Sequence, residues 1–274
     1  MADAVESLAD IVGSAIVYGG IRLGRRNPDE TTPYGYGKAE PLAALAVSLL
    51  LIGAAIAIAF EAIREIRTPH HTPAWWTLLV LVIVIVVKET LFRMQRRRAS
   101  ASGSSAAQAD AWHHRADAIT SIAAFVGISI ALIGRYRTGT DVWAPADDWA
   151  ALLASALILF NAVKLMIPPV RELMDVHAPE VGEEAMSAAR TVDGVLYVQH
   201  ARARKSGVQY WIDMHVWVAS SMSVREAHTL AHRVKDAVRA ANSQVADVLV
   251  HVEPAAEPFA PAKATAGDPR PQSD

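Results

Sequence analysis

The chain has 274 residues, of which 52% are apolar and 20% are charged, and its formal net charge at pH 7 is -2. This weakly negative charge gives no sign of a nucleic-acid partner. Because cysteine is absent, disulfides, thiolate nucleophiles and sulfur ligands are excluded, and a transition-metal site must use imidazole and carboxylate groups. The apolar residues are segregated from the charged ones, which indicates a membrane protein with one small soluble domain.

Five apolar segments are long enough, or nearly so, to span a membrane as helices. We predict these spans at residues 4–23, 41–60, 75–87, 111–133 and 149–163. The second is the clearest, since Ser48 and Gly53 are its only interruptions. Arginine and lysine gather in the loop between the first two spans and in the loop between the third and fourth. Positive charge marks cytoplasmic loops, so the polar region after Arg171 is also expected in the cytoplasm.

The region after Pro168 and Pro169 changes character. Strand-like patterns cover residues 195–204, 208–218 and 245–252. Residues 223–241 predict an amphipathic helix that opens with the capping box Ser223-x-x-Glu226, and a shorter helix is predicted near 181–189. The order α-β-β-α-β predicts a compact α+β domain. We therefore expect a transmembrane all-α bundle (1–167), a cytoplasmic domain (168–255) and a disordered tail (256–274).

Two pairs of ionisable residues lie within the predicted spans, Glu6 with Asp10 in the first and His113 with Asp117 in the fourth. An ionisable group inside a span costs about 3 kcal/mol or more, so it marks a pathway or a binding site by default. Residues four apart share a helix face, and each pair can offer two ligand atoms to one point between neighbouring helices. The four donors could complete a tetrahedral cage that suits zinc, with Fe(II), Mn(II) and Co(II) as alternatives.

The same residues suggest how a bound cation would be released. Carboxylates and imidazole bind metal only when deprotonated, so protons compete with metal, which predicts metal/proton antiport. His113 is the natural switch, because a free imidazole has a pKa of roughly 6.5, and Asp117 is a second candidate. The donor set leaves no open coordination position and no general base, so we expect neither an enzyme nor a cofactor. The alternative is a salt bridge without metal, such as Asp117 with Arg115 or Arg22.

Three motifs occur in order along the chain: ADAVESLAD at residues 2–10, YGYGKAE at 34–40 and WHHRADA at 112–118. With these motifs, residues 2–254 resemble the cation diffusion facilitator family. The resemblance implies six transmembrane helices, of which the first would precede Met1, so five spans remain here. It also implies a transport site between the family's second and fifth helices. In this chain that site falls on Glu6, Asp10, His113 and Asp117.

The resemblance further implies an integral membrane homodimer that exports divalent cations, most often zinc, in exchange for protons. We expect it in a bacterial inner membrane, with the C-terminal domain in the cytoplasm. That domain would be ferredoxin-like or metallochaperone-like and would serve dimerisation and regulation. The alternative function is a nontransporting membrane metal sensor or partner subunit, in which the bundle anchors a metal-binding cytoplasmic domain.

In the cytoplasmic domain, the residues at the family's regulatory metal positions are His215, His228, His251 and Glu253. One further histidine position of the family falls on Gln199. His200 is the next residue after this position, so we expect its side chain to face the other side of the strand. His228 and His232 are spaced to share a metal on the helix, but solvated histidines are the alternative reading.

Two more positions follow from the resemblance. Lys38 and Asp175 occupy the places of a charge interlock where membrane and cytoplasmic domains meet at the dimer, with two solvated charges as the alternative.

In the loop between the first two spans, some family members hold a second metal with one aspartate and two histidines. Only Asp29 matches here, since Thr32 and Tyr36 stand at the histidine positions. We therefore expect no high-affinity metal site in that loop.

Overall fold

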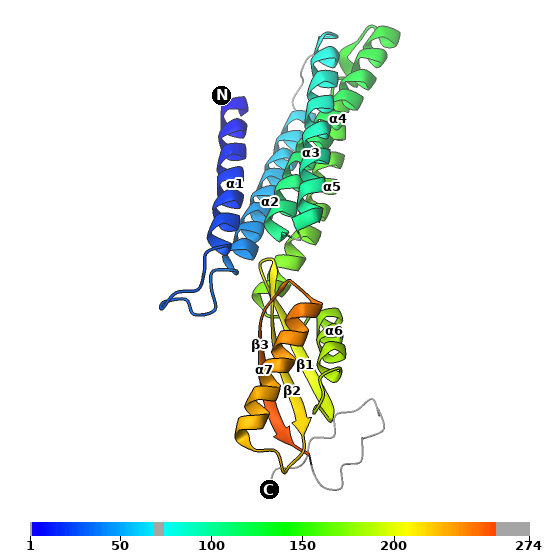
Figure 1. Ribbon diagram of the computed structural model, residues 1–274. Helices are drawn as coiled ribbons and strands as arrows, with labels where there is room; N and C mark the ends of the chain where they lie inside the picture. Colours follow the sequence, from blue (N-terminus) through cyan, green and yellow to red (C-terminus); the bar gives the residue numbers. More distant parts are fainter. Residues whose placement is uncertain (1, 68–73, 103, 256–274) are drawn as a thin grey trace. The chain divides into compact units, whose positions relative to one another are not determined.

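The structure is a computed structural model that describes residues 2–67, 74–102 and 104–255 (Figure 1). It divides into two compact units. The first comprises Met1–Val176 with Ser206–Val208, and the second comprises His177–Lys205 with Gln209–Asp274. The predicted tail, residues 256–274, lies outside the described residues.

The first unit is the predicted all-α bundle. Its helices are α1 (Ala2–Gly24), α2 (Ala39–Ile66), α3 (Thr77–Ser102), α4 (Ser105–Thr138) and α5 (Ala146–Leu173), with a short 3-10 turn, η1, at Asp141–Trp143. Helix α4 contacts all four others, and α2 also packs along α5 and α1. The five helices match the five predicted segments. Four extend beyond the segment at both ends, whereas α3 begins two residues inside its segment and continues past the end of it, because polar turns continue the helices past the apolar stretches.

Local signals explain where two of these helices begin and end. Ser104 caps α4, with its hydroxyl accepting the Ala107 N–H at 3.1 Å, and Gly139 ends α4 with φ +69°, a conformation that favours glycine. Helix α5 continues through Pro168 and Pro169 to Leu173. The break between the two units therefore falls after Val176, beyond the boundary that we predicted at residue 168.

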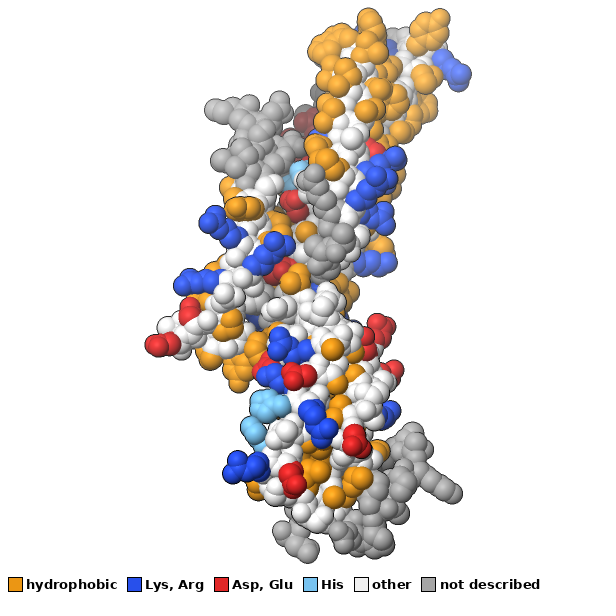
Figure 2. Space-filling model, in the orientation of Figure 1, with side chains coloured by type: hydrophobic (Ala, Val, Ile, Leu, Met, Phe, Trp, Pro, Cys, Tyr) orange, Lys and Arg blue, Asp and Glu red, His pale blue; other side chains and the backbone are white. Residues whose placement is uncertain are grey.

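Three helical segments of the described chain are long and apolar enough to cross a membrane: Ala39–Ile66, Ser105–Thr138 and Asp141–Leu173. Helices α1 and α3 are not among them. In α3 the apolar run ends at residue 87 and charged residues follow. Small residues such as Ala44, Ala55 and Ala162 are buried between helices, whereas large apolar side chains such as Phe60 point outward. This arrangement is typical of helices packed within lipid, and hydrophobic side chains cover much of the helical surface in Figure 2.

The second unit has the predicted order α-β-β-α-β. Its elements are α6 (Pro179–Arg190), β1 (Tyr197–Ser206), β2 (Gln209–Val218), α7 (Val224–Ala241) and β3 (Val245–Pro254), with sheet order β1-β2-β3 and β2 parallel to β3. The capping box between Ser223 and Glu226 is formed at the start of α7. Both helices pack on one face of the sheet, and the core there includes Met214 and Val234. The other face of the sheet carries polar residues such as His215 beside apolar ones such as Trp217 and Leu249.

Candidate metal sites

The pair that we predicted in the fourth span lies on α4. His113 and Asp117 are both half-buried and stand one helical turn apart. Their predicted partners, Glu6 and Asp10, lie on α1, but the side chains of these two residues fall outside the described part of the structure. Helix α1 contacts α4. The structure thus brings together the two helices that carry the four residues, and the convergence of the side chains stays a prediction.

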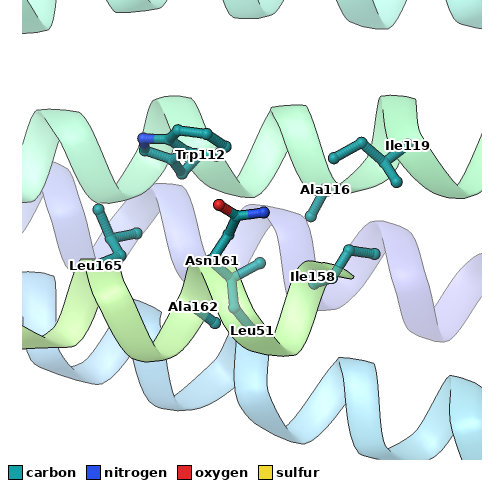
Figure 3. A pocket seen from close by; sticks show the side chains of 8 residues that line it. All are labelled: Leu51, Trp112, Ala116, Ile119, Ile158, Asn161, Ala162 and Leu165. Carbon is teal, nitrogen blue, oxygen red and sulfur yellow. The ribbon is translucent and has the colours of Figure 1, made fainter. Parts of the chain in front are cut away.

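The neighbours of this pair in sequence fill the bundle interior. Trp112, Ala116 and Ile119 turn toward α5, where they line a cavity of about 10 Å³ together with Asn161 and other side chains (Figure 3). A cavity of this size holds at most about one water-sized sphere. Successive helical residues point about 100° apart, so His113 and Asp117 project from a different side of α4 than Trp112 and Ala116. A cation at the pair would therefore not occupy this cavity.

The turn that holds Asp117 is reinforced by hydroxyl groups. Thr120 and Ser121 both donate to the backbone carbonyl of Asp117, each at 2.9 Å. Arg115, which we considered as a salt-bridge partner of Asp117, is engaged elsewhere. Its Nη1 lies 2.5 Å from Oε2 of Glu89 on α3.

Lys38 and Asp175, the predicted charge interlock, form a salt bridge within the first unit. Lys38 Nζ lies 2.9 Å from Asp175 Oδ1 and also donates to the Leu173 carbonyl at 3.4 Å. The ammonium group therefore sits at the C-terminal end of α5, where the helix dipole favours positive charge. Both side chains are 44% exposed, so the pair contributes at most about 1 kcal/mol to stability. Its predicted role at a dimer stays a prediction.

The open face of the sheet gathers metal-ligating side chains. His215 on β2 and His251 with Glu253 on β3 offer ligand atoms that all lie within 4.8 Å of one another. His215 and His251 are register partners on the parallel strands, and Glu253 follows two residues later on the same side. Glu253 Oε1 contacts His215 Nδ1 and lies 3.7 Å from His251 Nε2. Three of the four predicted regulatory residues are therefore brought together.

His200 joins this cluster, so our prediction that it faces away is wrong. Its ring centroid lies 4.2 Å from that of His215. The buried residues of β1 explain why, because Val198 and Ala201 are three apart whereas Ala201 and Ala203 are two apart. An extra residue in a strand shifts the alternation of its side chains, as in a β-bulge. The same odd spacing of apolar residues in the sequence could have revealed this.

The fourth predicted residue, His228, is not part of the cluster. It lies on α7, which covers the opposite face of the sheet. Its Nε2 lies 3.2 Å from Nε2 of His232, one helical turn further on, and both side chains are exposed. The described open sheet face therefore combines His200, His215, His251 and Glu253.

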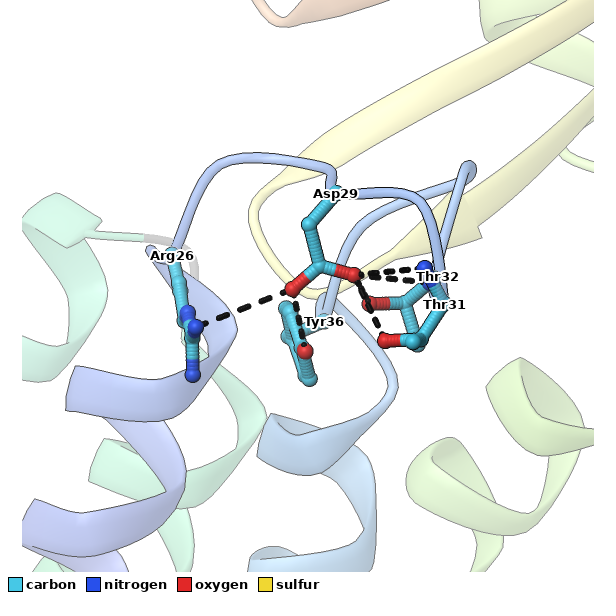
Figure 4. A network of polar contacts seen from close by, with 5 residues as sticks. All are labelled: Arg26, Asp29, Thr31, Thr32 and Tyr36. Atoms are coloured by element: carbon cyan, nitrogen blue, oxygen red, sulfur yellow. Dashed lines mark hydrogen bonds and ion pairs between the residues drawn. The ribbon is translucent and has the colours of Figure 1, made fainter.

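The loop between α1 and α2 presents the opposite situation. Asp29 Oδ1 accepts hydrogen bonds from the hydroxyls and backbone N–H groups of Thr31 and Thr32, and Oδ2 accepts one from the Tyr36 hydroxyl at 2.7 Å (Figure 4). Arg26 lies 3.7 Å from Oδ2. The bond from Tyr36, followed by those from Thr31 and Thr32, holds the pKa of Asp29 well below its usual range. Thr32 and Tyr36, which stand at the two histidine positions, thus bind the aspartate itself.

Comparison with known proteins places both units. Residues 1–174 match the cation efflux transmembrane domain, and residues 178–255 match the cation efflux protein cytoplasmic domain. The manganese efflux system protein MneP of Bacillus subtilis is 30% identical over 92% of this chain and 85% of its own length. The metal tolerance protein 2 of Oryza sativa is 30% identical over 92% and 70%. The cation-efflux pump FieF of Yersinia enterocolitica is 28% identical over 93% and 83%.

Among solved structures, a MamM C-terminal domain is 32% identical over 26% of this chain and 91% of its own length, with a TM-score of 0.26.

Proposed function

The chain belongs to the cation diffusion facilitator family of divalent metal efflux transporters, and we propose that it moves its cation by metal/proton antiport through Glu6, Asp10, His113 and Asp117. One observation carries the proposal. His113 and Asp117 stand half-buried, one turn apart, on an apolar helix that contacts α1. Ionisable groups at membrane depth are costly, and a metal ion shared with α1 would compensate for that cost.

The chemistry of the four groups supplies the coupling. Each carboxylate and the imidazole can donate a lone pair to a cation only when it carries no proton. A proton that binds His113 or Asp117 removes a ligand and adds positive charge, so it expels the cation. We propose His113 as the group through which a proton drives release of the cation.

Zinc is the first candidate cargo, because nitrogen and oxygen donors in a four-coordinate set suit it. Manganese is the main competitor, since three carboxylates are hard donors and the relative MneP is named for manganese efflux. We also propose that the chain forms a homodimer, as the match to the family's cytoplasmic domain supports.

Transport in vesicles tests this proposal. The purified chain would be reconstituted with a pH gradient, and uptake of Zn(II), Mn(II), Fe(II) and Co(II) would be followed. We expect Asp117→Asn to reduce uptake by about 100-fold or more. Glu61→Gln, which changes an exposed carboxylate near the C-terminal end of α2, serves as the control and should transport normally. Metal uptake that does not depend on the pH gradient would contradict the antiport mechanism.

A second function rests on the open sheet face. We infer that His200, His215, His251 and Glu253 bind a regulatory divalent cation, because three imidazoles and one carboxylate there come from three neighbouring strands. The test is equilibrium binding of Zn(II) and Mn(II) to full-length Asp117→Asn, in which the membrane site is weakened. One bound metal per chain is expected. If this site binds metal but no uptake occurs in the inserted, folded parent chain, the sensor function replaces the transporter.

A further inference from the structure

Residues of α3 and α4 line an open, positively charged pocket. This pocket plays no part in the proposed metal sites. Its volume is about 610 Å³. Six lining residues come from α3 and one comes from α4: Glu89, Phe92, Arg93, Arg96, Arg97, Ser100 and Arg115. The α3 residues recur every three to four positions, at 89, 92 and 93, 96 and 97, and 100, so they form one continuous stripe on that helix. Four arginines face a single carboxylate, and the lining carries a net charge of about three positive charges at neutral pH.

The internal contacts of the pocket hold two arginines and leave two available. Glu89 accepts from Arg93 Nε at 2.9 Å and from Arg115 Nη1 at 2.5 Å. The Phe92 ring lies under the guanidinium of Arg115, at 4.7 Å, and near that of Arg96, at 5.9 Å. Within the described residues, Arg96 and Arg97 form no ion pair with a carboxylate. No described carboxylate competes for these two guanidinium groups, so they can bind an anion from outside the chain.

The pocket lies where α3 changes from apolar to charged. The apolar run of α3 ends at residue 87, and the lining begins two residues later. The basic residues mark this end of α3 as the cytoplasmic one, and anionic lipids of the facing leaflet attract basic groups next to a span. Figure 2 shows basic side chains gathered beside the hydrophobic surface of the helices.

The same stripe continues into the apolar part of α3. Val86 and Val82 precede Glu89 at three- and seven-residue steps, and they are 60% and 45% exposed. A ligand that places a phosphate among the arginines could therefore lay a hydrocarbon chain along Val82 and Val86. A soluble phosphate would use only the charged half of this surface.

We propose that the pocket between α3 and α4 binds the phosphate of an anionic phospholipid headgroup. Arg96 and Arg97 donate to the phosphate oxygens, since the planar guanidinium matches phosphate geometry. Glu89 holds Arg93 and Arg115 through hydrogen bonds, and the Phe92 ring also contacts Arg115. The acyl chains pack against the exposed valines of α3.

Lipid retention on the purified, full-length chain tests the proposal. Native mass spectrometry in detergent would compare phosphatidylglycerol with phosphatidylcholine, and parallel titrations would use inorganic phosphate alone. We expect the parent to retain phosphatidylglycerol preferentially. Each basic group near an anionic surface strengthens binding roughly fivefold, so R96Q/R97Q should weaken the preference on the order of tenfold or more.

R22Q/R25Q is the matched control, because it removes two arginines from the end of α1 and leaves the pocket unchanged. It should keep the preference for phosphatidylglycerol. An equal loss in both double variants would overturn the proposal, since it would mean general charge attraction. If inorganic phosphate bound as tightly as the lipid, the ligand of the pocket would be a free phosphate and not a phospholipid. Unchanged melting temperatures show that lipid loss is not caused by unfolding, and Val82→Ser/Val86→Ser with an intact arginine pair should also weaken retention.

Discussion

Two regions of this molecule lie at positions where the family resemblance implies metal outside the membrane site, and their side chains are arranged in opposite ways. In the loop between α1 and α2, both oxygens of Asp29 accept hydrogen bonds from Thr31, Thr32 and Tyr36. On the open face of the sheet, His215 is surrounded by other potential ligands, His251 and Glu253. A carboxylate at a ligand position is therefore not sufficient to bind a metal, because the neighbouring residues decide whether its lone pairs are available.

The largest effect that this comparison predicts is the loss of metal at the sheet when His215 is removed. Its ring contacts those of His200 and His251, and its Nδ1 contacts Glu253, so it is the centre of the cluster. We expect His215→Ala to weaken Zn(II) binding by about 100-fold or more. Titration calorimetry on the full-length Asp117→Asn background measures this loss. His228→Ala is the control, and an equal loss there would show that the helix, rather than the sheet, holds the metal.

A second prediction concerns a variant in which the loop gains a cluster of imidazole and carboxylate groups like the one on the sheet. Thr32→His with Tyr36→His removes two hydrogen-bond partners of Asp29 and supplies two imidazoles in their place. We expect one additional Zn(II) per chain, measured by equilibrium dialysis, with binding that falls at acid pH as the ligands gain protons. The triple variant that also carries Asp29→Asn should lose the gain. If the double variant binds no extra metal, the availability of the Asp29 oxygens does not decide whether the loop binds metal.

The sequence predicted the architecture well because periodic patterns report which face of an element is buried. The helix starting at Ser223 and the strand order follow from local signals, and so does the α4 pair. His200 was misplaced because we assumed a regular alternation of side chains along β1, whereas the buried residues of that strand include one three-residue step. The arginine pocket was also missed, because the contact between Glu89 and Arg115 joins positions that are far apart along the chain.

His200 provides a third, smaller prediction. Its ring lies beside His215, but it is not within the group of His215, His251 and Glu253 whose ligand atoms lie closest together. We therefore expect His200→Ala to weaken Zn(II) binding only about tenfold. Gln199→Ala is the control, because Gln199 stands at the family's histidine position but is not part of the cluster found here. If Gln199→Ala weakened Zn(II) binding more than His200→Ala does, the ligand position would be residue 199, as the family resemblance implies, and not His200.

The smallest predicted effect concerns the stability of the loop and its dependence on pH. The hydrogen bonds lower the pKa of Asp29 in the folded chain from an ordinary value of 3.8, and the bond from Tyr36 is the largest cause. A lowered folded pKa means that the ionised carboxylate stabilises the fold at pH values above about 4, and that this contribution is lost as the pH falls through the folded pKa.

Tyr36→Phe should therefore raise the pKa of Asp29 and lower the melting temperature at pH 7 slightly, on the order of 1 °C, because the loop is exposed to solvent. The difference from the parent should shrink as the pH is lowered below 4. Tyr18→Phe, which removes an exposed phenol from α1, is the control for a hydroxyl outside the network. A Tyr36→Phe effect that stays constant across the pH range would mean that the phenol acts by packing and not through Asp29, and the contrast between loop and sheet would then need another explanation.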